Sequence, residues 1–154
     1  MDSDLGPLAT DAYQHVAAEL MAPLLEFVRL ARASCGGDLD KFLVLLAIGL
    51  RTSRHRRYME ATAEDFMSGR TAILPGFGVY AQSIATGVGM PKETARRKVS
   101  EMVAAGWLVR QDRRLYLTAK CYQDLAPLRE RLKVLAIAHY RTVQKMQVQS
   151  RAAR

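Results

Sequence analysis

The sequence predicts a mainly α-helical protein with one small β-hairpin, and two observations support this fold class. First, apolar residues recur at helical spacing near both ends of the chain and again within Pro91–Gly106. Second, two short strand-like runs, Trp107–Arg110 and Leu115–Thr118, flank polar residues, as expected for a tight hairpin. A chain of 154 residues is long enough to bury a core, so we expect one compact domain overall.

The segment Pro91–Gly106 is predicted to be an amphipathic helix. Pro91 suits a first helical turn, where its missing N–H needs no partner, and Gly106 suits the left-handed residue that ends a helix. Charged and polar residues fall opposite the apolar face, which consists of Ala95, Val99, Met102 and Val103. An isolated helix of this kind is more often a solvated surface than a binding surface. The flanking sequence therefore decides its role.

The residues before this helix have the spacing of a helix-turn-helix motif. They follow the pattern I-A-x-x-(V/L)-G-x-x-x-x-T through Ile84-Ala85, Val88-Gly89 and Thr94. A small alanine lets two helices approach closely, and a glycine makes the turn between them. We expect a shorter helix whose inner face includes Val79. With the hairpin, residues 79–118 resemble the winged helix-turn-helix regulators of bacteria, and this resemblance implies binding to DNA.

Residues 89–97 are similar to the recognition helix of the Crp/Fnr family. They read GMPKETARR, where that family shows G-x-S-R-E-T-V-x-R. The similarity does not extend to the whole Crp architecture, because no cyclic-nucleotide β-barrel precedes the motif. It implies that Lys92, Glu93 and Arg97 contact bases and that Thr94 lies near a phosphate. The chain departs from the family at Pro91, usually serine, and at Arg96, which is small in many members and which we expect to add a contact of its own.

The chemistry of these side chains supports the same interpretation. Arginine pairs bidentately with guanine, and glutamate accepts a hydrogen bond from the cytosine amine. We expect Lys92, Glu93, Arg96 and Arg97 to face base edges in the major groove, with Glu93 and Arg97 contributing most to discrimination. Contacts with the DNA backbone are expected from the hairpin and the motif helices, namely from Gln82, Ser83, Thr94, Arg110, Arg113 and Arg114.

Charge is sorted along the chain. The net charge is +8 and the isoelectric point about 9.9, which points to a polyanionic partner, with nucleic acid first and an anionic membrane surface second. Residues 1–35 hold five acids and two bases, whereas residues 119–154 hold two acids and eight bases. Residues 76–118 hold three acids and seven bases, so the positive charge lies in the predicted DNA-binding motif and after it.

The N-terminal part, residues 1–57, is expected to supply core and dimerisation helices. A first helix spans residues 8–33, with a kink or break near Pro23. Asp38 or Asp40 is predicted to cap a second helix, whose run Phe42–Leu50 is apolar nearly all round and therefore buried in the core or in a subunit interface. The basic cluster Arg51–Arg57 at its end either complements the helix dipole or contacts phosphates.

The remaining segments complete the predicted layout. Residues 58–78 form a connector, with a capping box at Thr62–Asp65 and a possible third strand at Ala72–Leu74. A long helix over Lys120–Gln149, interrupted near Pro127, and the basic tail Arg151–Arg154 make up a C-terminal dimerisation region, residues 119–154. Terminal helices that flank a winged helix-turn-helix resemble the plan of MarR-like regulators, which implies a homodimer.

We expect no catalytic residues, no metal site and no cofactor. The histidines His15, His55 and His139 are far apart in sequence, and Cys35 and Cys121 lack a C-x-x-C pattern. Acidic N-terminal residues argue against a secretory signal, and no run of ~18 apolar residues suggests a membrane helix, so a cytoplasmic protein is expected. Three alternatives remain open: a protein–protein interaction module, a plasmid- or phage-type replication or accessory protein, and a repressor that responds to a small-molecule effector.

Overall fold

The computed structural model describes residues 13–152 and divides the chain into two compact units. One unit, here the helical hairpin, consists of the chain up to Ala31 and from Pro127 onward. The other, here the winged-helix unit, is Arg32–Ala126. Each unit is described separately. The fold is mainly helical with one small antiparallel hairpin, as the sequence predicts.

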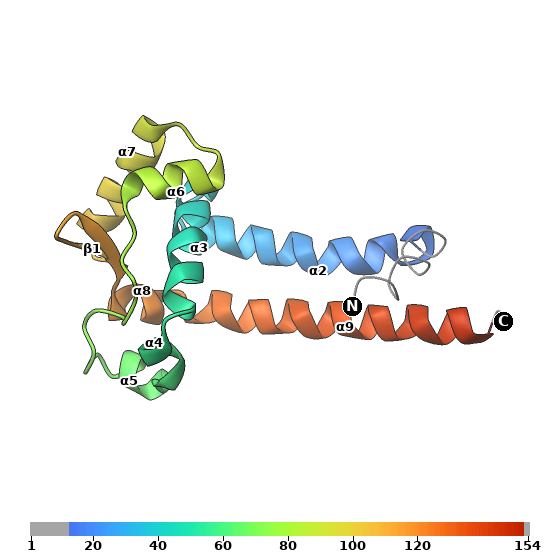
Figure 1. Ribbon diagram of the computed structural model, residues 1–154. Helices are drawn as coiled ribbons and strands as arrows, with labels where there is room; N and C mark the ends of the chain where they lie inside the picture. Colours follow the sequence, from blue (N-terminus) through green and yellow to red (C-terminus); the bar gives the residue numbers. More distant parts are fainter. Residues whose placement is uncertain (1–12, 153–154) are drawn as a thin grey trace. The chain divides into compact units, whose positions relative to one another are not determined.

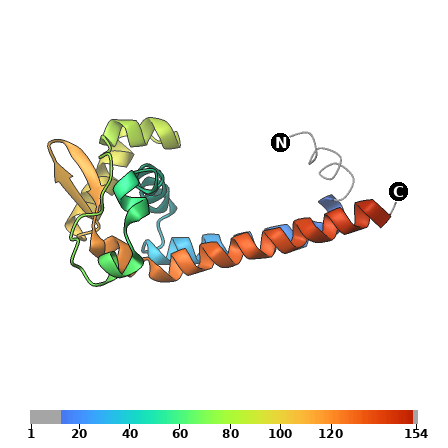
Figure 2. The ribbon, with the colours of Figure 1, turned by 60° about the horizontal axis from the view of Figure 1, so that its bottom comes forward.

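The helical hairpin pairs two long helices from the two ends of the chain. Helix α2 (Tyr13–Ser34) and helix α9 (Ala126–Ala152) run antiparallel, side by side, in both views (Figures 1 and 2). Lys145 Nζ lies 2.9 Å from Glu19 Oε1, and His139 Nε2 donates to the Leu20 carbonyl at 2.9 Å. Helix α2 continues through Pro23, so the alternative of a break into two helices is wrong. Residues 8–12 and 153–154 lie outside the described residues.

Two helices bury only part of their apolar surface. In α2, Met21 is 54% exposed and Leu25 59%; in α9, Ile137 is 52% exposed and Tyr140 63%. Val16 and Met146 are among the few apolar side chains of this unit that are buried. The hairpin therefore presents apolar side chains to solvent along both helices.

The winged-helix unit contains six helices and two strands among its described residues. The helices are α3 (Leu39–Ser53), α4 (Arg56–Glu60), α5 (Ala63–Met67), α6 (Ala81–Val88), α7 (Lys92–Ala104) and α8 (Ala119–Asp124). The strands are β1 (Leu108–Gln111) and β2 (Arg114–Leu117). The core of this unit lies between α3, α6, α7 and the β-hairpin formed by β1 and β2. Its most deeply buried large side chains are Val44, Ile48, Ile84, Val99, Met102 and Leu115.

Capping explains where several helices begin. Asp38 accepts a hydrogen bond from the Lys41 N–H at the start of α3, and Thr62 and Asp65 form the predicted reciprocal capping box of α5. Helix α8 ends at Asp124 and α9 begins at Ala126, so the predicted interruption near Pro127 is confirmed. Proline is tolerated in the first turn of α9, because the N–H that it lacks would have no intrahelical partner there.

The prediction that helix α3 is buried in the core or in a subunit interface is confirmed for one face of the helix, and the subunit interface stays a prediction for the other. Val44, Leu45 and Ile48 are buried in the core, but Leu46 and Leu50 are 51% and 52% exposed. A helix that is apolar on every side does not reveal which side faces the core, and α3 buries only one face within the described residues.

The helix-turn-helix is formed as predicted, with one correction. Gly89 ends α6 with φ 68°, and its N–H donates to carbonyls of the last turn, so α7 begins three residues later. Val79 does not belong to α6. Its backbone instead exchanges hydrogen bonds of 3.1 and 2.8 Å with Leu115 of β2. Extended backbone at residue 79 pairs with the outer edge of β2, which a helical residue there could not do.

The hairpin, or wing, is closed by the two residues Asp112 and Arg113, which both have positive φ. This is the backbone of the tight turn that matches the twist of two paired strands. The predicted third strand at Ala72–Leu74 does not form, but its pairing beside the wing is present as an isolated bridge between Ile73 and Thr118, with a 2.9 Å bond from the Leu74 N–H to the Leu117 carbonyl.

Candidate nucleic-acid interface

The outer face of α7 is solvent-exposed and carries the four predicted base-contacting residues. Its inner face is fully packed: Ala95 and Val99 are 0% exposed and Met102 is 1% exposed. The side chains predicted to contact bases, Lys92, Glu93, Arg96 and Arg97, are all exposed. Because the inner residues anchor the helix, its outer side chains project from a rigid support.

Charges on this face are partly paired with each other. Arg96 Nη1 lies 3.1 Å from Glu93 Oε1, with side chains 68% and 81% exposed. An exposed pair of this kind contributes at most about 1 kcal/mol, so it can open when a competing partner arrives. Among residues 13–152, Lys92 and Arg97 have no ion-pair partner. Thr94, predicted near a phosphate, is half-buried.

Two ion pairs hold α7 against α3. Lys98 bonds to the cap residue Asp38, and Lys41 Nζ lies 2.7 Å from Glu101 Oε2. Burial by itself raises the pKa of Asp38, but the hydrogen bonds from Lys98 and from the Lys41 N–H outweigh it and lower the pKa overall. The Lys98 side chain is only 12% exposed, so this cation serves the packing of the unit and is removed from the outer face.

The first turns of α6 and α7 have free backbone donors. Tyr80 and Pro91 occupy the N-cap positions, and neither forms a side-chain cap hydrogen bond. Uncapped N–H groups and the helix dipole attract anions such as phosphate. Gln82 and Ser83, predicted to touch the DNA backbone, lie exposed in the first turn of α6.

The wing tip presents an arginine in a costly backbone conformation. Arg113 has φ 66° and is exposed, and it has no ion-pair partner in the described part of the chain. A residue with a side chain costs about 1 kcal/mol or more in this region relative to glycine. Arg110, in the adjacent strand, is also exposed. Both cations are therefore available to a partner.

Arg114 lies at the base of the wing and is already engaged. Its Nε donates to the Tyr80 hydroxyl at 3.2 Å and its Nη1 to the Phe77 carbonyl at 3.3 Å. Its guanidinium also stands 5.3 Å from the centre of the Tyr80 ring. These contacts fasten the wing to the segment before α6, a role that the sequence analysis did not foresee.

The structure thus brings the predicted residues into one unit but divides their roles. Those with free charges are Lys92, Arg97, Arg110 and Arg113, whereas Arg114 is bonded within the unit. The sequence analysis did not predict the ion pairs Lys98–Asp38 and Lys41–Glu101. Their α7 members, Lys98 and Glu101, lie beside the apolar face of that helix and are visible in the sequence. In the basic cluster after α3, Arg56 pairs with Glu60 at 2.7 Å, and Arg54 and Arg57 are exposed.

The described residues were also searched for a metal site, for cysteine pairs and for a membrane-spanning helix. Within 13–152, no three His, Cys, Asp or Glu side chains are arranged to hold a metal ion. Both cysteines are free and buried, and burial raises the pKa of the Cys35 thiol to about 11. None of the helices that the structure describes has the length and apolarity needed to cross a membrane.

Comparison with known proteins leaves the family open. No family model matches the chain, and no curated protein matches it. The chain is similar to the crystal structure of a protein from Pseudomonas aeruginosa PA01 that is described as a candidate transcriptional regulator. The match has 19% identity and a TM-score of 0.47, and it covers 94% of this chain and 98% of that one. Similarity at this level is too low to transfer a function.

Proposed function

We propose that this protein binds double-stranded DNA sequence-specifically and regulates transcription as a homodimer. The observation that carries the proposal is the outer face of α7, where exposed cations project from a helix whose inner face is completely packed. A packed helix with arginine and lysine on its free side suits insertion into the major groove. The uncapped first turns of α6 and α7 and the free cations of the wing add contacts for phosphates on either side.

The homodimer rests on the exposed apolar side chains of the helical hairpin. Leu132, Ile137 and Tyr140 of α9 and Leu24 and Leu25 of α2 are between 46% and 63% exposed. Burial of such side chains contributes about 25 cal/mol for each Å² of apolar surface removed from water, and a second hairpin would complete a four-helix bundle. A two-fold dimer presents two copies of α7 to half-sites about one helical turn apart.

Selection of bound fragments from a random duplex library tests both parts of the proposal. We expect enrichment of an inverted repeat with half-site centres ~10 base pairs apart. Enrichment of a single, non-repeated site would contradict the dimeric arrangement. A library that remains random after several rounds would contradict sequence-specific binding and favour a protein-interaction role for α7.

Arg97 provides a test of base reading. Arg97→Ala should weaken binding to the selected duplex by about 1–3 kcal/mol and relax the preference at one base position. Arg97→Lys keeps the charge but loses the planar fork, so it should lose the same preference while retaining more affinity for a scrambled duplex. Arg29→Ala, an exposed arginine on α2, is the control. Equal losses on selected and scrambled duplexes would rule out direct readout by Arg97.

The dimer has its own test. Ile137→Glu places a charge on the exposed apolar side of α9 and should convert the protein to a monomer in analytical ultracentrifugation. Affinity for the inverted repeat should fall to that for one half-site. Met59→Glu, at a similarly exposed position of α4 in the winged-helix unit, should leave the dimer intact. A wild-type protein that sediments as a monomer at micromolar concentration would refute the proposed assembly.

A further inference from the structure

The face of α3 that is turned away from the core carries a row of exposed leucines. Leu39 and Leu43 are each 39% exposed, Leu46 is 51% exposed and Leu50 is 52% exposed. Their spacing of four, three and four residues is that of the a and d positions of a coiled coil, so they form one stripe along the helix, here called the leucine stripe. The opposite face of α3 is packed in the core of the winged-helix unit, so the stripe has a fixed support.

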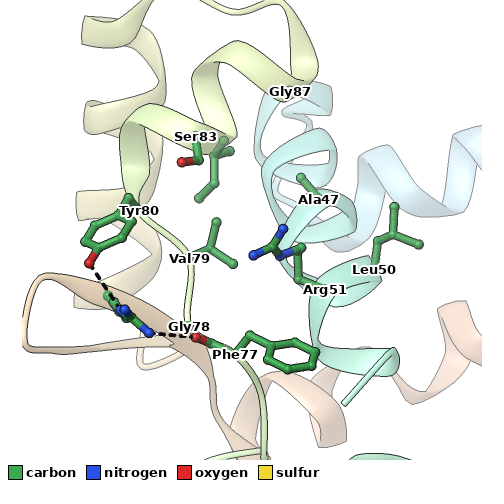
Figure 3. Close-up of a pocket in the computed structure, with 11 residues that line it drawn as sticks. Ala47, Leu50, Arg51, Phe77, Gly78, Val79, Tyr80, Ser83 and Gly87 are labelled. Atoms are coloured by element: carbon green, nitrogen blue, oxygen red, sulfur yellow. Dashed lines mark hydrogen bonds between the residues drawn. The ribbon is translucent and has the colours of Figure 1, made fainter.

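The leucine stripe has opposite charges at its two ends. Asp40 is exposed at the beginning of α3, and Arg51 and Arg54 are exposed at its end. Within residues 13–152, none of these three side chains has an ion-pair partner. At the edge of a groove of about 520 Å³, the last leucine of the stripe, Leu50, is directed away from Val79 (Figure 3). A helix face that is acidic at one end and basic at the other is complementary to a reversed copy of itself.

Two small residues flank the middle of the leucine stripe. Ala47 and Gly49 lie on either side of it, so a second helix can approach α3 closely. Glycine destabilises the middle of a helix relative to alanine. The winged-helix unit does not require glycine here, because a Cβ at Gly49 would meet nothing within 4 Å and its backbone does not have positive φ. A helix packed against α3 from outside is a reason for a residue without a side chain at this position.

From these features we infer that α3 packs antiparallel against α3 of a second copy of this chain, through the leucine stripe. A two-fold axis at the middle of the stripe places Leu43 against Leu46 of the second copy. The same axis places Leu39 against Leu50, and it brings Asp40 to the basic end of the other helix. This contact is separate from the apolar face of the helical hairpin on which the proposed homodimer rests, and it does not depend on DNA binding.

The contact is small. A single pair of packed helices buries less surface than a standard interface, which takes about 800 Å² from each partner. The pairing is therefore weak on its own, which is compatible with an Ile137→Glu variant that sediments as a monomer at micromolar concentration. Disulfide cross-linking suits such a contact, because each encounter in the correct register is trapped by a covalent bond.

Cross-linking of the full-length protein tests the pairing and its direction. Residues 39 and 50 are about three turns apart on one helix, too far for a disulfide within a chain. An antiparallel pair brings each of these positions beside the other, so the double variant Leu39→Cys/Leu50→Cys should form a covalent dimer at least about tenfold faster than either single variant. The native cysteines are buried and do not compete.

The two single variants are the matched controls, because they carry the same exposed thiols. In the antiparallel pair, identical positions at the ends of the stripe are about 16 Å apart along the helices, so a single variant has no nearby thiol. Equal rates for the double and single variants would overturn the inference. A parallel pair would cross-link each single variant as fast as the double variant, and this result would overturn the antiparallel arrangement.

A mixing experiment tests the complementary charges. In the double-cysteine background, Asp40→Arg makes both ends of the stripe basic, whereas Arg51→Asp/Arg54→Asp makes both ends acidic. Each protein alone should cross-link at least about threefold more slowly than its parent, and an equal mixture should recover the parent rate. Mixing cannot restore a loss of helix stability, so recovery would identify contact between copies. A mixture as slow as its components would overturn the pairing of opposite ends.

Two further variants separate the leucine stripe from other surfaces. In the double-cysteine background, Leu46→Gln should slow cross-linking at least about tenfold, whereas Met59→Gln, at an exposed position of α4, should leave the rate unchanged. A Leu46→Gln variant that cross-links at the parent rate would overturn the role of the stripe. With Ile137→Glu added, the double-cysteine variant should still cross-link faster than the single variants. Loss of that difference would overturn an independent contact, whereas failure of the duplex selection would refute only the proposed DNA binding.

Discussion

The substitution Gly78→Ala should destabilise the winged-helix unit, because two separate penalties meet at this residue. Gly78 has φ 69°, and a residue with a Cβ costs about 1–2 kcal/mol there. The added Cβ would also lie 2.7 Å from the Tyr116 ring and 2.9 Å from the Arg114 Cβ, closer than real atoms approach. Displacing these side chains adds about 1–3 kcal/mol, so we expect a total of about 2–5 kcal/mol.

Denaturant unfolding followed by Trp107 fluorescence measures this cost. Trp107 is the only tryptophan of the chain, and its Nε1 donates to Asp124 at 2.8 Å, so its emission reports on the winged-helix unit. The matched control is Gly87→Ala, which should raise stability by about 0.5–1 kcal/mol because it relieves the cost of glycine within α6. The same chemical change should thus have opposite signs at two positions nine residues apart. A Gly78→Ala midpoint equal to wild type would refute the steric reasoning, as would shifts of equal sign.

Three further outcomes are expected. Because Asp38 has a lowered pKa in the folded state, its pairing with Lys98 stabilises the protein fully above pH ~4 and is lost as the pH falls through the folded pKa. Asp38→Asn keeps a capping side chain, so its stability deficit relative to wild type should shrink as the pH falls below ~4 and through the folded pKa of Asp38; a deficit independent of pH would exclude the charge. Cys35, with a thiol pKa of about 11 and 3% exposure, should resist alkylation at pH 8 until the protein unfolds, and rapid labelling of the native protein would contradict its burial. Arg113→Gly should stabilise the wing by about 1 kcal/mol and lower the salt dependence of DNA binding by about one unit of slope, whereas an unchanged slope would remove the wing tip from the interface.

Local signals predicted most of the winged-helix unit. Caps at Asp38 and Thr62, the turn at Gly89 and the two-residue hairpin depend on residues close in sequence, so single-sequence rules apply to them. The sequence predicted a kink or a break near Pro23, and the break is wrong because α2 continues through this proline. Exposed leucines on α3 were not foreseen, since uniform apolarity leaves the direction of the core undetermined.

The candidate site also combines features that the sequence predicts with features that depend on contacts between distant parts of the chain. The faces of α7 follow from a period of 3.6 residues, so the outward direction of Lys92 and Arg97 was predictable. The bonds of Arg114 to Phe77 and Tyr80 were not predictable, because they span more than thirty residues of sequence. The two ion pairs that hold α7 against α3 also join distant segments, and no local pattern predicts them. Non-local pairings of this kind become visible only in three dimensions.

Some of the cations that make up the net charge of +8 stabilise the fold, so they are not available to a nucleic acid. Within the winged-helix unit, Lys41 and Lys98 hold α7 in place, and Arg114 holds the wing against the segment before α6. Those cations cannot contact a phosphate without loosening the scaffold. Among the described residues of this unit, cations without an ion-pair partner include Lys92 and Arg97 on α7 and Arg110 and Arg113 on the wing. The physical basis of the proposed nucleic-acid binding is therefore the placement of unpaired charge on packed supports, and the total charge is only a guide to it.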